Sequence, residues 1–226
     1  MATLVLVRHA RTAETGLRLS GRIEGIPLSE AGRSEASALA EELATVRFAG
    51  IVCSPIQRCL ETAQAVLDYR SAGTTARPVP VIDERLTEVD YGNWSGRELR
   101  SLAKDPLWRT VQQQPSAVTF PAGEALQSAA ARGIAAVREW DARFGADDTW
   151  LAVSHGDLIK AIVADAIGTP LDLFQRISVD PASVTVIRYG KERPRVLSLN
   201  EAPAGIASRL VAGRRRGLVG RLLGRG

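Results

Sequence analysis

Residues 3–10, Thr-Leu-Val-Leu-Val-Arg-His-Ala, are a short apolar run that ends in two basic side chains. A strand that is buried on both faces of a sheet shows such an unbroken apolar pattern, because neither face meets water. The run therefore predicts a buried parallel strand, with Arg8 and His9 at its carboxyl end. Ligands of open parallel sheets bind beyond the carboxyl ends of the strands, so this pair is the first candidate for a functional site.

A second stretch repeats the arrangement. Residues 150–154 form an apolar run that is followed by His155 and Gly156, and the sequence contains only two histidines, His9 and His155. If both strands lie in one parallel sheet, their carboxyl ends meet at the same edge. The sequence thus predicts that both imidazoles come together there.

Two further predicted strands are followed by other candidate site residues, an arginine and two carboxylates. Residues 50–54 form a third short strand, and Arg58 lies in the first turn of the helix that follows it. A helix N-terminus offers free N–H groups and a positive dipole end, which favours an anion. Residues 79–82 are a strand candidate that precedes a loop-like segment with two carboxylates, Glu88 and Asp90.

Together these side chains match the chemistry of phosphoryl transfer. Guanidinium groups bind phosphate oxygens bidentately, and a neutral imidazole is a nucleophile. A carboxyl group supplies the general acid that the departing oxygen needs. The set therefore favours a site for a phosphate dianion.

The rest of the pattern predicts an α/β fold. Apolar residues with helical spacing occupy one face of residues 29–46, and an alanine-rich segment, residues 124–144, predicts a long helix. Residues 184–189 and 196–199 predict two more strands. Strands that alternate with helices indicate a three-layer α/β/α sandwich with a mainly parallel central sheet.

The charge of the chain is unevenly distributed. The formal net charge is +4, but residues 202–226 contain six arginines and no acidic residue, so the remainder carries a formal charge of −2. A function in nucleic-acid binding cannot be argued from the basic balance alone. We expect one domain over residues 1–202 and a flexible Gly/Arg-rich tail over 203–226. The tail is a candidate for weak contact with an anionic surface, since leucines and valines alternate with its arginines.

Composition also bears on the compartment. The N-terminal segment reads as a strand and not as a signal peptide, no apolar stretch is long enough to span a bilayer, and two cysteines do not make a disulfide framework. These features predict a cytoplasmic protein. A homodimer is expected only from the frequency of such assemblies.

Several motifs in fixed order resemble one known family. They are Arg8-His9-Ala10, Leu28-Ser29-x-x-Gly32, Ser54-Pro55-x-x-Arg58-x-x-x-Thr62-Ala63, Glu88-x-Asp90-x-Gly92-x-Trp94-x-Gly96, Pro121-x-Gly123-Glu124 and Ser154-His155-Gly156. The set is similar to the histidine phosphatase (phosphoglycerate-mutase-like) superfamily over roughly residues 3–200. The resemblance implies a phosphoglycerate-mutase-like fold and a phosphatase that hydrolyses a small phosphomonoester without a metal or another cofactor.

The resemblance also implies a role for each residue. His9 would attack phosphorus and form a phosphohistidine, while Arg8, Arg58 and His155 would hold the phosphoryl oxygens. Glu88 would protonate the leaving oxygen and then activate water. The substrate-binding set is completed by two residues, Thr15 and Gly156.

The sequence departs from the family pattern after the nucleophile. Ala10 replaces the usual Gly, and Thr15 replaces an Asn, which shortens the reach toward a phosphate oxygen. Asp157 follows Gly156 and would disfavour highly anionic substrates.

Alternatives remain at three points. Asp90 could compete with Glu88 for the acid role. A cofactor-dependent phosphomutase of the same superfamily is the nearest rival, although residues 97–119 offer only Lys104 and Arg109 beside Arg97 and Arg100 for a second phosphate. A non-catalytic phospholigand-binding protein is the second alternative function.

Both cysteines and most of the tryptophans are predicted to be structural residues. Cys53 and Cys59 are predicted to be structural, since the spacing from Cys53 to Arg58 does not fit a cysteine phosphatase loop. Trp94, like most of the tryptophans, is assigned to the core. Trp108 and Phe120 are the two aromatic residues expected near the pocket.

Overall fold

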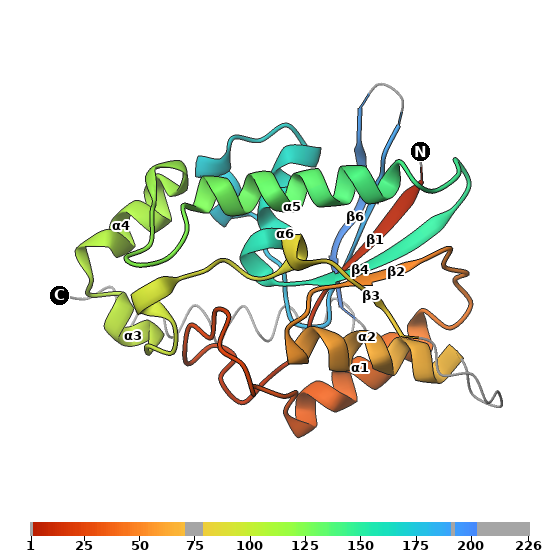
Figure 1. The fold of residues 1–226 in the computed structure, drawn as a ribbon, viewed down its shortest axis with the longest axis horizontal. Helices are drawn as coiled ribbons and strands as arrows, with labels where there is room; N and C mark the ends of the chain where they lie inside the picture. Colours follow the sequence, from red (N-terminus) through yellow and green to blue (C-terminus); the bar gives the residue numbers. More distant parts are fainter. Residues whose placement is uncertain (1, 71–78, 191–192, 203–226) are drawn as a thin grey trace.

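The computed structural model describes residues 2–70, 79–190 and 193–202, which form a six-stranded sheet with helices on both faces (Figure 1). The strand order is β3-β2-β4-β1-β5-β6. The strands are β1 (Thr3–Arg8), β2 (Ile51–Cys53), β3 (Val81–Ile82), β4 (Thr149–Ser154), β5 (Val184–Arg188) and β6 (Arg195–Glu201). The α-helices in the described ranges are α1 (Glu30–Glu42), α2 (Gln57–Arg70), α3 (Leu99–Leu102), α4 (Pro106–Gln113), α5 (Leu126–Asp141) and α6 (Gly156–Ala166), and the longest 3-10 helix there is η4 (Leu171–Arg176).

The predicted mainly parallel sheet is confirmed. β1, β4, β2 and β3 are parallel to one another, whereas β5 pairs antiparallel with β1 and β6 pairs antiparallel with β5. The register pairs Arg8 of β1 with Ser154 of β4. Because these two strands end level, the residues that follow them, His9 and His155, meet at one edge of the sheet.

Alternating side chains of the central strands enter two cores, which accounts for the three layers. Leu4 and Leu6 of β1 lie in the core on the side of α5 and α6, whereas Val5 and Val7 lie in the core on the side of α1 and α2. Both faces are buried, so the strand shows no polar alternation. Figure 1 shows the two helical layers on opposite sides of the sheet.

Local hydrogen bonds and close backbone contacts determine where α1 begins. The Ser29 side chain accepts from the N–H of Gly32 and caps α1. A Cβ on Gly32 would overlap the backbone of Arg11, so this glycine allows the first turn to lie against that segment. α2 begins at Gln57, so Arg58 lies in its first turn.

The segment between β3 and α5 forms short helical pieces at one end of the molecule, which include α3 and α4 (Figure 1). Here the expectation for two aromatic residues is wrong. Phe120 is buried in the core, and Trp108 stacks on Trp94 with ring centroids 6.2 Å apart; neither lines the cavity described below. Both rings pack against Trp94 and not against the cavity.

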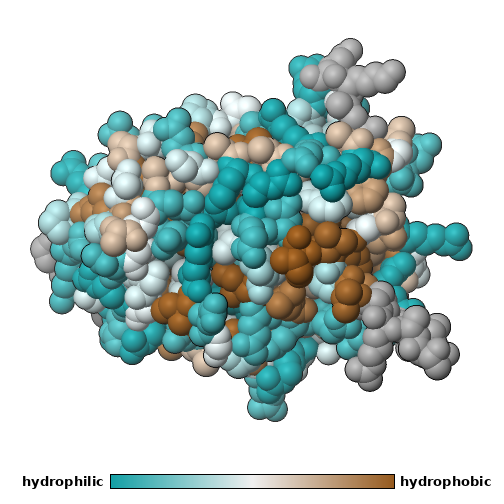
Figure 2. Space-filling model, viewed as in Figure 1, coloured by the Kyte–Doolittle hydropathy of each residue, from teal (hydrophilic) through white to brown (hydrophobic). Residues whose placement is uncertain are grey.

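The edge of the sheet at β3 is apolar and exposed. Val79, Val81 and Ile82 are exposed, and Figure 2 shows a hydrophobic patch on the face where β3 lies in Figure 1. Within the described ranges, no helix combines the length and the apolarity that a membrane crossing requires. The predicted tail over residues 203–226 lies outside the described residues.

Candidate active site

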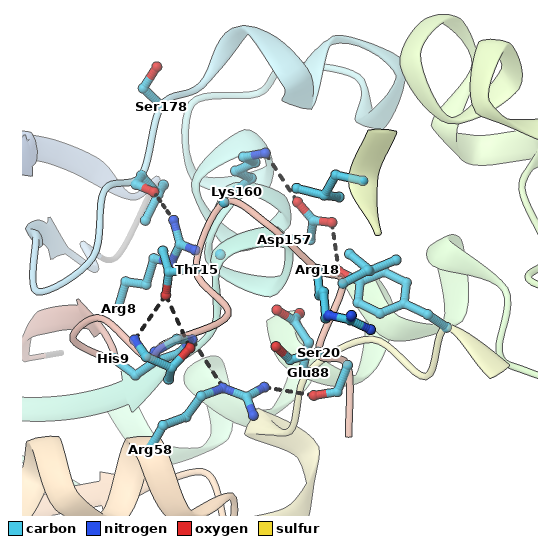
Figure 3. A pocket seen from close by; sticks show the side chains of 18 of the residues that line it. Arg8, His9, Thr15, Arg18, Ser20, Arg58, Glu88, Asp157, Lys160 and Ser178 are labelled. Atoms are coloured by element: carbon cyan, nitrogen blue, oxygen red, sulfur yellow. Dashed lines mark hydrogen bonds and ion pairs between the residues drawn. The ribbon is translucent and has the colours of Figure 1, made fainter. Parts of the chain in front are cut away.

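A cavity of about 380 Å³ lies beyond the carboxyl ends of β1 and β4. Six of the residues expected at the site line it: Arg8, His9, Thr15, Arg58, Glu88 and Gly156. Figure 3 shows the His9 side chain between those of Arg8 and Arg58, with Glu88 on the far side of the cavity. The structure therefore brings together groups that are up to 148 residues apart in the sequence, from Arg8 to Gly156.

Hydrogen bonds fix the orientation of the His9 ring. Nδ1 lies 2.8 Å from the carbonyl oxygen of Ala10 and must donate to it, so Nδ1 carries the proton. Nε2 is then free to accept, and Arg58 Nε donates to it over 3.2 Å. Burial, followed by the charges of Arg8 and Arg58, holds the pKa of His9 well below its ordinary value. The ring is neutral, with a lone pair on Nε2 at the cavity.

Arg58 is 2 % exposed and contacts three partners. Besides His9, its Nη2 donates to the carbonyl oxygen of Gly21 over 2.6 Å and to Nδ1 of His155 over 3.2 Å. Its Nη1 is buried and has no hydrogen-bond partner among the described residues. A buried N–H that is left unpaired is costly, which indicates that a ligand acceptor belongs there.

Arg8 offers a second such donor. Its Nη1 donates to the carbonyl oxygen of Val179 over 2.7 Å, while its buried Nε has no partner in the described part of the chain. An added Cβ on Gly156 would lie 3.3 Å from the guanidinium carbon of Arg8, so the glycine makes room for this side chain. Two guanidinium groups thus present unpaired N–H groups beside the neutral imidazole of His9.

His155 lies behind these groups. It is fully buried, its ring centroid is 5.2 Å from that of His9, and it is not among the residues that line the cavity. Its Nε2 is 2.7 Å from Ser54 Oγ, and its Nδ1 accepts from Arg58. In this arrangement His155 holds the Arg58 guanidinium, and burial keeps its own pKa well below the ordinary value.

Two carboxyl groups line the cavity, those of Glu88 and Asp157, and Glu88 is the candidate acid. Its side chain is 8 % exposed, and Oε1 accepts from the N–H of Val89 over 3.0 Å. Burial, with the nearby charge of Asp157, raises the pKa of Glu88 to about 7. The competing candidate Asp90 does not line the cavity, because its carboxylate accepts from the N–H of Gly92.

Thr15 is tied to its own loop. Its Oγ1 accepts from the N–H of Thr12 over 2.9 Å and lies 3.2 Å from the Thr12 hydroxyl (Figure 3). The side chain lines the cavity, and its hydroxyl retains a rotatable proton.

The two cysteines lie in the core. Both are buried, and burial raises the pKa of Cys59 to about 12 and that of Cys53 well above its ordinary value. A thiol with a raised pKa is a poor nucleophile. Both cysteines therefore lie where the sequence interpretation expected structural residues.

Apart from Asp157, the sequence interpretation missed the residues of the outer wall of the cavity. Lys160 donates to Asp157 over 3.1 Å (Figure 3). Lys160 also donates to Gln175 over 3.1 Å, and Tyr91 donates to Asp157 over 2.8 Å. Arg18 also lines this wall. The signal that could have found Lys160 is its place one turn after Gly156, on the helix that starts at the predicted site.

Comparisons with known proteins agree with this geometry. The family model of the histidine phosphatase superfamily (branch 1) matches residues 4–202. The chain is 32% identical over 206 residues to phosphoserine phosphatase 1 of Hydrogenobacter thermophilus, which covers 88% of this chain and 92% of that protein. It is 34% identical over 178 residues to glucosyl-3-phosphoglycerate phosphatase of Mycolicibacterium vanbaalenii, with 75% and 76% covered.

A solved structure shows the same fold. The mycobacterial glucosyl-3-phosphoglycerate phosphatase in complex with VO3 superimposes with a TM-score of 0.77 at 28% identity and covers 88% of this chain and 99% of that one. The motifs, the fold and the family model all lead to one assignment: the chain belongs to the histidine phosphatase superfamily.

Proposed function

We propose that this protein hydrolyses a small phosphomonoester through a phosphohistidine on His9. One observation supports this most directly: the unpaired N–H groups of Arg8 and Arg58 lie buried on either side of the neutral His9 ring. A phosphate dianion supplies the acceptors that these donors lack, and charge-assisted bonds to guanidinium are strong. Thr15 and Gly156 complete the phosphate end of the cavity.

In the first step, the Nε2 lone pair of His9 forms a bond to phosphorus as the ester P–O bond breaks. Arg8 and Arg58 stabilise the charge on the non-bridging oxygens, and His155 holds Arg58 in place. Glu88 is protonated near neutral pH and gives its proton to the leaving oxygen. An alcohol departs, and the phosphoryl group stays on His9.

In the second step, Glu88 acts as the base. Its carboxylate takes a proton from water as the water oxygen attacks phosphorus and the N–P bond breaks. Inorganic phosphate leaves, and both Glu88 and His9 return to their starting protonation states. None of the proposed steps uses a metal or another cofactor. Assay in the presence of EDTA tests this, and we expect the activity to persist.

The outer cavity indicates what the leaving group carries. The volume of the cavity far exceeds that of a phosphate, and Arg18 and Lys160 line its wall, where Asp157 offsets part of the positive charge by pairing with Lys160. Two named relatives are a phosphoserine phosphatase and a glucosyl-3-phosphoglycerate phosphatase, and both names describe phosphate esters that carry a carboxylate. We therefore propose a leaving group with a carboxylate. A panel of acidic and neutral phosphomonoesters, with kcat/KM measured for each, tests this.

A phosphomutase of the same superfamily is the alternative. It must hold a second phosphate, and the only cationic side chains that line the cavity beyond Arg8 and Arg58 are Arg18 and Lys160 among the described residues. Lys160 is already bonded to Asp157, so the wall is weakly cationic. Incubation with 3-phosphoglycerate and 2,3-bisphosphoglycerate decides: we expect free phosphate, and isomerisation would show a mutase.

The decisive experiment compares wild type with His9→Ala on a generic aryl phosphate. We expect phosphate release by wild type only. If both proteins are inactive, the non-catalytic phospholigand-binding alternative is favoured; if both are equally active, His9 is not the nucleophile.

Three expectations about the surroundings stay predictions. They are a cytoplasmic location, a homodimer, and contact between an anionic surface and residues 203–226. Light scattering of the full chain measures the oligomeric state directly.

A further inference from the structure

We infer that Glu124, held between Arg22 and Arg132, positions the main chain of the acid Glu88 and thereby its proton donation to the leaving oxygen. This inference rests on the proposed function, because it takes Glu88 as the general acid. The residues to which it assigns a task do not line the cavity. Glu124 is a positioning residue and does not touch the substrate.

The carbonyl oxygen of Glu88 is the centre of the arrangement. Arg22 Nε donates to it over 2.9 Å, and Arg132 Nη2 donates to it over 3.1 Å. Arg132 Nη1 also donates to the carbonyl oxygens of Arg85 and Thr87, each over 2.7 Å. One guanidinium on α5 thus binds three carbonyls of the segment that presents Glu88.

Glu124 joins both arginines and the other side of this segment. Its Oε1 accepts from Arg22 over 2.9 Å, from Arg132 over 2.7 Å and from the N–H of Asp90 over 2.8 Å. Burial raises the pKa of Glu124, but hydrogen bonds from Arg132 and Asp90 lower it below the ordinary value. The carboxylate is therefore charged and holds both cations against the backbone of residues 88–90.

Two glycines allow this close approach. A Cβ on Gly92 would overlap the carbonyl oxygen of Pro121, and a Cβ on Gly123 would overlap that of Asp90. The N–H of Glu124 donates to the same Asp90 carbonyl over 3.0 Å. The segments 88–92 and 121–124 are thus bound together at backbone distance directly behind the acid.

The loop that carries Arg22 also contacts a residue that binds His9. Gly21, the neighbour of Arg22, accepts from Arg58 Nη2 over 2.6 Å, and Arg58 in turn donates to His9. The loop thereby links the position of the acid to that of the phosphate clamp. A shift of Glu88 by a fraction of an ångström weakens proton transfer, since general acid catalysis depends on hydrogen-bond distance.

The test uses leaving groups of different basicity. An alkyl phosphate needs a proton on its departing oxygen, whereas 4-nitrophenyl phosphate departs readily without one. We expect Glu124→Gln to lower kcat/KM for the alkyl phosphate about ten- to a hundredfold, within the range of acid catalysis. The loss with 4-nitrophenyl phosphate should be less than about threefold.

Asp165→Asn is the matched control. Asp165 pairs with Arg138 at 2.7 Å, its side chain is 25% exposed against 20% for Glu124, and it does not line the cavity. We expect this variant to keep wild-type values for both substrates. Arg132→Lys is the second probe if Glu124→Gln does not fold, because lysine keeps the charge but cannot span three carbonyls.

A double variant distinguishes failure of the positioning role of Glu124 from failure of the acid role of Glu88. In a Glu88→Gln background, Glu124→Gln should have no further effect on the alkyl phosphate, since its effect acts through Glu88. Equal losses with both substrates, or additive losses in the double variant, would overturn the positioning role. If Glu88→Gln itself shows no dependence on the leaving group, the assignment of the acid fails instead.

Discussion

Arg58 Nε donates to Nε2 of His9 over 3.2 Å, so the nitrogen that attacks phosphorus in the proposed mechanism faces a permanent cation before substrate binds. A protonated Nε2 could not accept this bond. The contact keeps the imidazole neutral and aimed at the cavity, and a phosphate oxygen competes with Nε2 for the guanidinium once it is bound. Arg58 thus serves both the resting enzyme and the transition state.

The first prediction concerns the ionisation of His9. The pKa of His9 lies well below its ordinary value because of burial and the charges of Arg8 and Arg58. Removal of one cation in Arg58→Ala should raise that pKa toward the ordinary value. The protein has only two histidines, so NMR can follow both rings through a pH titration. A wild-type His9 that titrates near 6.5 would contradict the geometry.

The second prediction concerns pH and rate. The pKa of Glu88 is about 7, so the acid is protonated below that pH and ionised above it. For an alkyl phosphate, kcat/KM should fall about tenfold per pH unit above about 7. Glu88→Gln should lose this limb of the profile, together with most of the activity. A limb that persists in Glu88→Gln would assign the titration to another group.

The third prediction concerns pH and stability. The folded protein keeps Glu88 protonated between its ordinary pKa of 4.5 and about 7, whereas the unfolded chain releases the proton there. The contribution of Glu88 to stability is therefore lost as pH rises through this window. Glu88→Gln should raise the free energy of unfolding at pH 8 by on the order of 1–3 kcal/mol. At about pH 5 the effect should be small. Denaturant titrations at both values measure it, and an equal effect at both would be evidence against a buried carboxyl with a raised pKa.

The fourth prediction compares two glycines with positive φ. Gly92 has φ of 49° and faces the carbonyl oxygen of Pro121, whereas Gly25 has φ of 72° and open space around it. Both Gly→Ala variants incur the left-handed backbone cost of about 1–2 kcal/mol. Only Gly92→Ala adds the overlap, so its loss of unfolding free energy should exceed that of Gly25→Ala by about 1–3 kcal/mol. Similar losses would show that the two segments can separate.

The sequence predicts the ends of the strands well. The run from Thr3 to Arg8 and the run before His155 are apolar on both faces, and parallel strands bring their carboxyl ends to one edge. That rule places His9 beside His155 without knowledge of long-range contacts. The family resemblance favoured Glu88 over Asp90, but the residues alone left the choice open, because it depends on which carboxylate lines the cavity.

The surroundings of the site could not be predicted in the same way. Arg132 reaches the carbonyl oxygen of Glu88 across 44 residues, and Lys160 meets Gln175 from another element. Such pairs have no local pattern. Trp108 and Phe120 were misplaced for a related reason, since composition does not tell whether an aromatic side chain in an irregular segment faces a ligand or another ring.

The central claim is that the phosphoryl group passes through His9. Rapid mixing of the enzyme with substrate, an alkaline quench and mass spectrometry of the peptides test it most directly, because phosphohistidine survives base and is lost in acid. The account predicts a phosphorylated peptide that contains His9 in wild type and none in His9→Ala. With 4-nitrophenyl phosphate it predicts more of this peptide in Glu88→Gln, because that leaving group needs no proton whereas the attack of water on the phosphohistidine is slowed. Phosphate on any other residue, or turnover by His9→Ala at the wild-type rate, would contradict it.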